Sequence, residues 1–154
     1  MKFVLDTSAF ISGFLPEEDE YYTVIEVINE LQDDYSKEKL GYFLNSGKIK
    51  IKEPNLDNVH KVYSVLKNTG DRLSLTDIKI VALAIETGST IISEDYGIQN
   101  ISSFLGIKFN SIREHGIKKV IYWEYYCIGC KQVYLNNKAF CDNCGNIIKR
   151  RPKK

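Results

Sequence analysis

The chain has 154 residues, enough for one ordinary domain and a small appendage, and its composition is globular, with 44% hydrophobic and 27% charged residues. No apolar run approaches the roughly 18–20 residues that a membrane span needs. Asp6 interrupts the apolar stretch over residues 1–16, and no small-residue cleavage site follows, which argues against a signal peptide. Four cysteines in such a chain indicate a reducing, cytoplasmic compartment and favour metal binding over disulfides.

The net charge of +1 hides a division along the chain. Residues 116–154 have a net charge of +7, whereas residues 1–115 have a net charge of −6. An acidic body joined to a basic tail favours nucleic-acid binding by the tail and cation binding by the body. The alternative is that the charges only make each part soluble.

The segment over residues 2–5 is a short apolar run that ends abruptly at Asp6. A run that is apolar on both faces predicts a central strand of a parallel sheet. Further along the chain, the patterns predict a helical turn over 7–14 and helices over 17–34, 36–44, 56–67 and 78–86. Strands are expected over 48–52, 90–93 and 107–112. This alternation predicts an α/β domain with a mostly parallel sheet, in which the strongly apolar helix 78–86 is buried.

The composition changes at residue 118, where a β-like aromatic stretch leads into two pairs of cysteines. We therefore expect a first domain over residues 1–117, a small ribbon with its lead-in strand over 118–150, and a basic tail over 151–154 whose last residues are disordered.

Three carboxylates are expected at one edge of the sheet. Asp6 and Asp95 each follow a buried strand, and parallel strands place both at the carboxyl edge, where ligands bind in such sheets. The helix that feeds the second strand runs antiparallel to it, so Asp77 at the start of that helix lies at the same edge. Clustered carboxylates repel one another unless a hard cation offsets their charge, which predicts a Mg²⁺ or Mn²⁺ site.

Each carboxylate also has a purely structural interpretation. Asp77 fits a capping box with Ser74, Asp95 fits a turn, and Asp6 fits a helix cap. A fourth ligand is expected from the helix 17–34, where Glu26 and Glu30 share a face and spacing does not choose between them. Two further acids remain as reserves, Glu94 and Asp71.

The strongest motif is a pair of CxxC knuckles separated by ten residues, Cys127-x2-Cys130 and Cys141-x2-Cys144. Four thiolates in this spacing predict a tetrahedral structural zinc that supplies most of the folding energy of so small a module. Two disulfides are the alternative. Basic residues around the knuckles are suited to RNA phosphates: Lys131, Lys138, Lys149, Arg150 and Arg151.

The segment over residues 3–10 resembles the opening of a PIN-domain nuclease, and residues 75–77 and 92–100 resemble the later acidic motifs of that family. With the four-cysteine ribbon directly behind them, they resemble the compact, archaeal-type form of the Nin-one-binding endoribonucleases over essentially the whole chain. The resemblance implies a PIN-like fold followed by a zinc ribbon. It implies metal ligands at Asp6, Glu30, Asp77 and Asp95, although the last position often reads Asp-Asp and here reads Glu94-Asp95. It also implies orienting hydroxyls at Thr7, Ser8 and Thr76.

The resemblance implies a metal-dependent endoribonuclease that matures the 3′ end of small-subunit ribosomal RNA and leaves 5′-phosphate and 3′-hydroxyl ends. The expected partners are pre-ribosomal RNA and the precursor of the small ribosomal subunit, with no membrane. Two other interpretations remain: a toxin-type PIN ribonuclease, or a non-catalytic RNA-binding assembly factor. A ribbon that binds only protein is a third possibility.

Overall fold

A five-stranded, wholly parallel sheet forms the centre of the larger part of the molecule. The structure is a computed structural model that describes residues 1–113 and 115–153. The strands are β1 (Lys2–Leu5), β2 (Glu20–Thr23), β3 (Ile49–Ile51), β4 (Thr90–Ile92) and β5 (Phe109–Asn110), in the spatial order β3-β2-β1-β4-β5. The predicted central strand therefore lies between β2 and β4, and its residues Val4 and Leu5 are fully buried.

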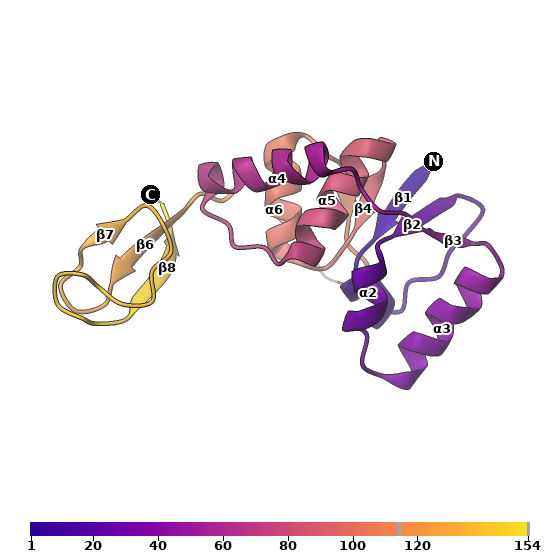
Figure 1. Cartoon of the computed structure of the whole chain (residues 1–154), viewed down its shortest axis with the longest axis horizontal. Coiled ribbons are helices and arrows are strands. Elements are labelled where there is room, and N and C mark those ends of the chain that lie inside the picture. Colours follow the sequence, from indigo (N-terminus) through magenta and orange to yellow (C-terminus); the bar gives the residue numbers. More distant parts are fainter. Residues whose placement is uncertain (114, 154) are drawn as a thin grey trace.

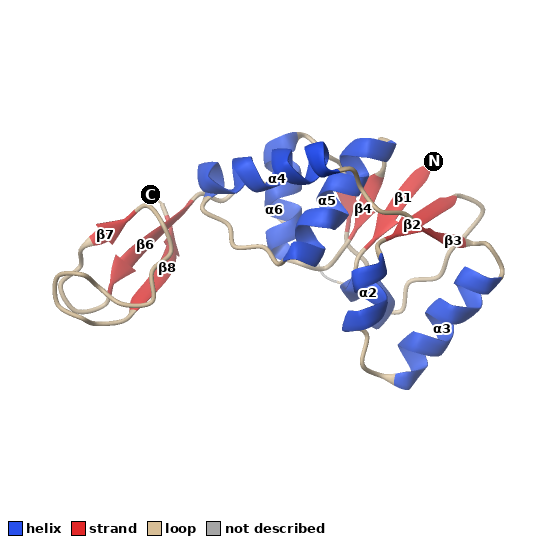
Figure 2. Cartoon of the chain, in the orientation of Figure 1, coloured by secondary structure: helices blue, strands red, loops and turns tan. Residues whose placement is uncertain are grey.

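Six helices surround the sheet: α1 (Thr7–Ile11), α2 (Ile25–Glu30), α3 (Asp34–Asn45), α4 (Leu56–Thr69), α5 (Leu75–Thr87) and α6 (Tyr96–Leu105). Helix α5 contacts β1 and β4 and also packs against α4 and α6, while α2 and α3 lie on the other side of the sheet (Figure 2). Ile80, Val81 and Leu83 of α5 are fully buried, which confirms the predicted buried helix. The predicted fold class, a parallel α/β sheet flanked by helices, is confirmed as well.

Two expectations about local structure were wrong. The segment 17–34 is not one helix, because Glu20–Thr23 forms β2 and only Ile25–Glu30 is helical. Aromatic and β-branched residues favour a strand there, and Tyr21 stacks on Phe3 of β1 with ring centroids 5.5 Å apart. No helix was expected over residues 96–105, where a turn at Asp95 was only an alternative, but this segment is the helix α6, which Asp95 caps.

The ribbon is a three-stranded antiparallel sheet built from β6 (Trp123–Cys127), β7 (Val133–Tyr134) and β8 (Ile148–Pro152), in the order β7-β6-β8. Its buried cluster consists of only four residues: Tyr125, Cys127, Cys141 and Ile148. Strand β8 extends through residues 151 and 152, the first two residues of the predicted basic tail. Lys154, the end of the predicted tail, lies outside the described residues.

The ribbon lies beside the carboxyl end of α4, where a buried hydrogen-bond network joins it to the body (Figure 1). Asp71 accepts hydrogen bonds from Thr69 Oγ1 at 2.6 Å, Asn100 Nδ2 at 2.7 Å and Trp123 Nε1 at 3.1 Å. Asn100 Nδ2 also donates to the Ile121 carbonyl oxygen at 2.7 Å, and the Ile121 amide donates to Asn100 Oδ1 at 2.6 Å. Because Asp71 and Asn100 are buried, these bonds fix where the chain leaves the body.

Candidate functional site

Asp6 lies at the carboxyl end of the central strand, with only 4% of its surface exposed. Its carboxylate accepts hydrogen bonds from Ser8 Oγ at 2.6 Å, Ser93 Oγ at 2.6 Å and the Ala9 amide at 3.1 Å, so it also caps α1. Burial raises the pKa of Asp6 to about 6, although these hydrogen bonds oppose the rise, and the charge of Asp95 adds to it. Asp6 therefore caps α1, as predicted, and its carboxyl group also has a raised pKa.

Asp77 occupies the first turn of α5, where the predicted capping box is present. The Ser74 amide donates to Asp77 Oδ2 at 3.2 Å, and the Asp77 amide donates to Ser74 Oγ at the same distance. Partial burial raises the pKa of Asp77, and the negative charges of Asp95 and Glu30 raise it further. Asp77 is thus electrostatically coupled to two of the other predicted ligands.

Asp95 caps helix α6, which was not predicted from the sequence. Its Oδ1 accepts from the amides of Gly97 at 2.7 Å and Ile98 at 3.1 Å. Its own amide donates to Ser93 Oγ at 2.9 Å, and Ser93 Oγ in turn donates to Asp6. Ser93 therefore connects two of the predicted ligands. The connecting role of Ser93 was not predicted from the sequence. The available signal was its hydroxyl group directly after the buried strand β4.

Helix α2 separates the two acids that spacing could not distinguish. Thr7 Oγ1, next to Asp6 in the chain, donates to Glu30 Oε2 at 2.7 Å. Glu26 instead forms an ion pair with Lys79, which also pairs with Glu53 at 2.7 Å. Glu30 is therefore directed toward the start of α1, and Glu26 toward α5 and a lysine.

The two reserve acids have other partners. The Glu94 carboxylate accepts hydrogen bonds from the amides of Ile112 and Arg113, the second at 2.9 Å. Asp71 belongs to the joint with the ribbon. Asp95, the second acid of the pair Glu94-Asp95, raises the pKa of both Asp6 and Asp77.

Four carboxylates from separate segments, Asp6, Glu30, Asp77 and Asp95, thus lie near one edge of the sheet. The charge of Asp95 raises the pKa of Asp6 and Asp77, and the charge of Glu30 also raises that of Asp77. Within the described ranges, however, only the four cysteines bring three or more ligand atoms within 4.8 Å of one another. Caps and hydroxyl groups orient the oxygens of the acids. Unneutralised carboxylate oxygens are a donor set that fits Mg²⁺ or Mn²⁺.

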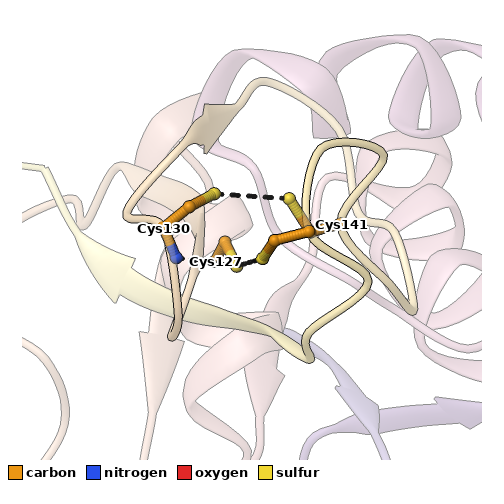
Figure 3. Close-up of side chains that lie close together, drawn as sticks. Cys127, Cys130 and Cys141 are labelled. Carbon is orange, nitrogen blue, oxygen red and sulfur yellow. Dashed lines mark hydrogen bonds between the residues drawn. The ribbon is translucent and has the colours of Figure 1, made fainter.

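The four cysteines converge as their spacing predicts, with all sulfur atoms within 4.8 Å of one another. Cys127 Sγ lies 3.3 Å from Cys144 Sγ, and Cys130 Sγ lies 3.6 Å from Cys141 Sγ (Figure 3). These distances far exceed the roughly 2.05 Å of a disulfide bond, and all four thiols are free. The group is compatible with a tetrahedral metal site, and it has no open position for catalysis.

Hydrogen bonds to sulfur favour the thiolate form that a metal requires. The amides of Gly129 and Cys130 donate to Cys127 Sγ at 3.3 and 3.4 Å, although burial outweighs these bonds and raises the pKa of Cys127 to about 11. The Tyr134 hydroxyl lies 3.1 Å from Cys141 Sγ and lowers the pKa of that thiol to about 6. The ribbon is therefore prepared for a cation, as the body is, but with soft ligands.

The predicted RNA-binding cations of β8 lie over aromatic rings of β6. The Arg150 guanidinium is 4.0 Å from the Trp123 ring centre, and that of Arg151 is 4.4 Å from the Tyr126 ring centre. Arg151 also forms an ion pair with Glu124 at 2.8 Å. One of these two arginines is therefore partly neutralised.

The three remaining predicted RNA-binding residues, all lysines, also differ in whether a carboxylate pairs with them. Lys138 pairs with Asp142 and lies 5.1 Å from the Tyr134 ring centre. Within the described chain, neither Lys131 nor Lys149 pairs with a carboxylate. Of the five predicted RNA-binding cations, Lys131, Lys149 and Arg150 therefore carry a charge that no carboxylate neutralises among the described residues.

Comparison with known proteins agrees with this architecture. Residues 3–87 match the family described as the PIN domain of ribonuclease. Endoribonuclease Nob1 of Pyrococcus abyssi (strain GE5 / Orsay) is 37% identical, covering 100% of this chain and 96% of its own length. Endoribonuclease Nob1 of Methanothermobacter thermautotrophicus (strain ATCC 29096 / DSM 1053 / JCM 10044 / NBRC 100330 / Delta H) is 40% identical, covering 98% of this chain and 93% of its own length. The chain belongs to the PIN-domain ribonucleases and, within them, to the Nob1 endoribonucleases, which confirms the predicted family and class of enzyme.

Two further comparisons concern the toxin-type alternative. Ribonuclease VapC1 of Thermoplasma acidophilum (strain ATCC 25905 / DSM 1728 / JCM 9062 / NBRC 15155 / AMRC-C165) is 36% identical, covering 97% of this chain but 78% of its own length. The structure of VapBC-1 from nontypeable Haemophilus influenzae covers 72% of this chain and 98% of that chain, with a TM-score of 0.52 and 17% identity, and so shows a shared fold alone. The two Nob1 relatives match over nearly their full length, so the toxin-type interpretation is not favoured. In the described part of the chain, no helix is long and apolar enough to cross a bilayer.

Proposed function

We propose that this protein is a divalent-metal-dependent endoribonuclease that matures the 3′ end of small-subunit ribosomal RNA in the cytoplasm. The supporting observation is the group of carboxylates at the sheet edge, where the charge of Asp95 raises the pKa of both Asp6 and Asp77. PIN nucleases in general require divalent metal ions. The pre-ribosomal RNA and the precursor of the small subunit would be its partners.

Asp6, Glu30, Asp77 and Asp95 would hold the ion, Mg²⁺ or Mn²⁺. When bound, such an ion activates water and stabilises negative charge on a phosphate. Ser8 and Ser93 keep the Asp6 carboxylate in a fixed orientation, and Thr7 does so for Glu30. Hydrolysis adds water across the P–O3′ bond: oxygen joins phosphorus and a proton goes to the 3′ oxygen, leaving 5′-phosphate and 3′-hydroxyl ends.

The ribbon would serve binding rather than chemistry. Zinc held by Cys127, Cys130, Cys141 and Cys144 would stabilise it, and Lys131, Lys138, Lys149, Arg150 and Arg151 would contact RNA phosphates. We assign residues 1–117 to the nuclease domain, 118–150 to the ribbon and 151–154 to the basic tail. An acidic body alone would bind RNA weakly, so the ribbon would supply affinity.

The test is cleavage of a precursor RNA that spans the 3′ end of the small-subunit RNA, with Mn²⁺ added. Wild-type protein should give one 5′-phosphorylated product, and Asp6→Asn should give none above background. Asp57→Asn, an exposed acid in the first turn of α4, is the control and should cleave normally. Equal cleavage by Asp6→Asn and wild type would disprove the proposed mechanism.

A further inference from the structure

A cleft of about 590 Å³ lies between the end of α4 and the ribbon, and the proposed hydrolysis does not use it. The body contributes Tyr63, Lys67 and Arg72 to its walls. The ribbon contributes residues 135–137, a leucine and two asparagines. The cleft thus exists only because the two parts are held against each other.

The walls of the cleft are fixed by the joint. Tyr125 of β6 is buried and donates its hydroxyl hydrogen to the carbonyl oxygen of Gly70 at 2.7 Å, next to the Asp71 network. Gly70 adopts φ +76°, and a Cβ atom there would lie 2.7 Å from the Trp123 carbonyl oxygen. The close approach of backbone to backbone therefore requires glycine at this position. A cleft bounded by such contacts is preformed.

The side chains that line the cleft match unpaired RNA. Lys67 and Arg72 are exposed, and among the described residues neither forms an ion pair with a carboxylate. Tyr63 is 69% exposed, so its ring is open to stacking, and Asn136 and Asn137 offer amide groups to base edges. Cations beside an exposed aromatic ring are the pattern that binds single strands, whose bases are free to stack.

The cleft also leads toward the acidic edge. Leu73 lines the cleft, and its Cδ2 lies 2.9 Å from where a Cβ atom on Gly97 would be. Gly97 donates to the Asp95 carboxylate, and the chain after Leu73 enters α5 near Asp77. A strand that occupies the cleft would therefore continue to the predicted metal ligands.

We propose that this cleft binds a single-stranded segment of the RNA substrate, with an unpaired base stacked on Tyr63 and phosphates at Lys67 and Arg72. The inference rests on the proposed function, because it assumes an RNA substrate. A duplex lacks the free bases that the cleft requires, so the cleft selects single-stranded RNA.

Binding without turnover tests the proposal. Fluorescence anisotropy would measure the affinity of the zinc-loaded full chain, without Mn²⁺, for a labelled single-stranded RNA of about 12 nucleotides and for a blunt duplex. Tyr63→Ala should weaken single-strand binding about fivefold or more and leave duplex binding unchanged. The matched control is Tyr42→Ala, because Tyr42 is also 69% exposed and its helix, α3, lies far from the ribbon (Figure 1).

A charge-matched pair gives the second comparison. Lys67→Ala with Arg72→Ala should weaken single-strand binding about fivefold or more. Lys61→Ala with Lys108→Ala removes the same charge from a hollow at the other end of the sheet and should change it less than about twofold. A 4-thiouridine-labelled RNA should also crosslink to the wild-type peptides that contain Tyr63 or Asn136, which does not depend on the folding of any variant.

The outcomes separate this inference from the proposed function. If Tyr63→Ala binds as tightly as Tyr42→Ala and crosslinks fall outside the cleft, the cleft proposal is wrong, even where Mn²⁺-dependent cleavage by wild type supports the nuclease. If the cleft binds single strands and wild type does not cleave with Mn²⁺, the nuclease proposal fails and the cleft proposal stands.

Discussion

The body and the ribbon reach stability in opposite ways. The body buries a large apolar core around β1 and α5, in which Val4, Leu5 and Ile80 are fully buried. The ribbon buries only four side chains, and two of them, Cys127 and Cys141, are thiols. The body can fold without a metal, whereas the ribbon has too little apolar surface to do so.

The two predicted metal sites differ for the same reason. In the ribbon, backbone amides and the Tyr134 hydroxyl support four sulfur atoms that already lie together. In the body, Asp6 and Asp95 cap helices and Asp77 belongs to a capping box, and the charge of Asp95 raises the pKa of both Asp6 and Asp77. The ribbon site therefore stabilises its fold when filled, while the charges of the body site cost stability when it is empty.

Removal of a zinc ligand should have the largest effect. Structural zinc contributes about 10–16 kcal/mol to comparable small modules, so Cys127→Ser should unfold the ribbon and leave the body intact. Zinc content and limited proteolysis would show loss of metal and cleavage beyond residue 118. Ile128→Ser, between the first two cysteines, should keep its zinc. If the ribbon resisted protease without zinc, the proposal that the ribbon needs a metal to fold and the body does not would be wrong.

The second-largest expected effect is on the rate of RNA cleavage, and it should distinguish Glu30 from Glu26 in α2. Glu30→Gln should slow Mn²⁺-dependent RNA cleavage more than about 100-fold, because loss of a metal ligand should exceed the 10–100-fold typical of supporting groups. Glu26→Gln weakens only the ion pair with Lys79 and should cost less than about tenfold. Single-turnover rates at saturating RNA would measure both, and a larger loss in Glu26→Gln would reverse the assignment.

Much of the fold could be predicted from sequence, and the failures have physical causes. The central strand and α5 were predictable because continuous apolar runs have few other solutions. Strand β2 was missed because its apolar residues also fit helical spacing, and its pairing with β1 and β3 and the contact between Tyr21 and Phe3 appear only in the folded chain. Helix α6 was missed because Asp95 and Gly97 suit a turn as well as a helix start.

The candidate site was partly predictable for a related reason. Topology alone predicts that Asp6, Asp77 and Asp95 lie at one edge, and two CxxC pairs predict the sulfur cluster. The choice of Glu30 over Glu26 depends on tertiary partners, Thr7 and Lys79, that no spacing rule reveals. The linking role of Ser93 also appears only when β1 and β4 are placed side by side.

Ser93 gives a smaller expected effect, because it acts through its neighbours. Ser93→Ala removes the donor to Asp6 and the acceptor of the Asp95 amide, so the two carboxylates lose their common support. We expect about a 10–100-fold lower cleavage rate and a higher Mn²⁺ concentration for half-maximal activity. Ser46→Ala, at the end of α3, is the control, since its hydroxyl donates to the Phe43 carbonyl and lies outside the RNA cleft. An unchanged Mn²⁺ requirement would exclude Ser93 as a positioning residue.

The smallest expected effect is a gain in stability from Asp6→Asn, whereas Cys127→Ser should lose stability. The pKa of Asp6 in the folded protein, about 6, is above its ordinary value of 3.8, so folding favours the protonated form. Stability from this group is therefore full below about pH 4 and is lost as the pH rises through about 6. Asp6→Asn should then raise the free energy of unfolding of the body by about 1–2 kcal/mol at pH 7 without Mn²⁺, and by much less at pH 4. Denaturant unfolding at the two pH values measures the difference, with Asp57→Asn as the control. A destabilised Asp6→Asn body at pH 7 would mean that the Asp6 hydrogen bonds outweigh its burial, and that the body, like the ribbon, gains stability from its own ligands.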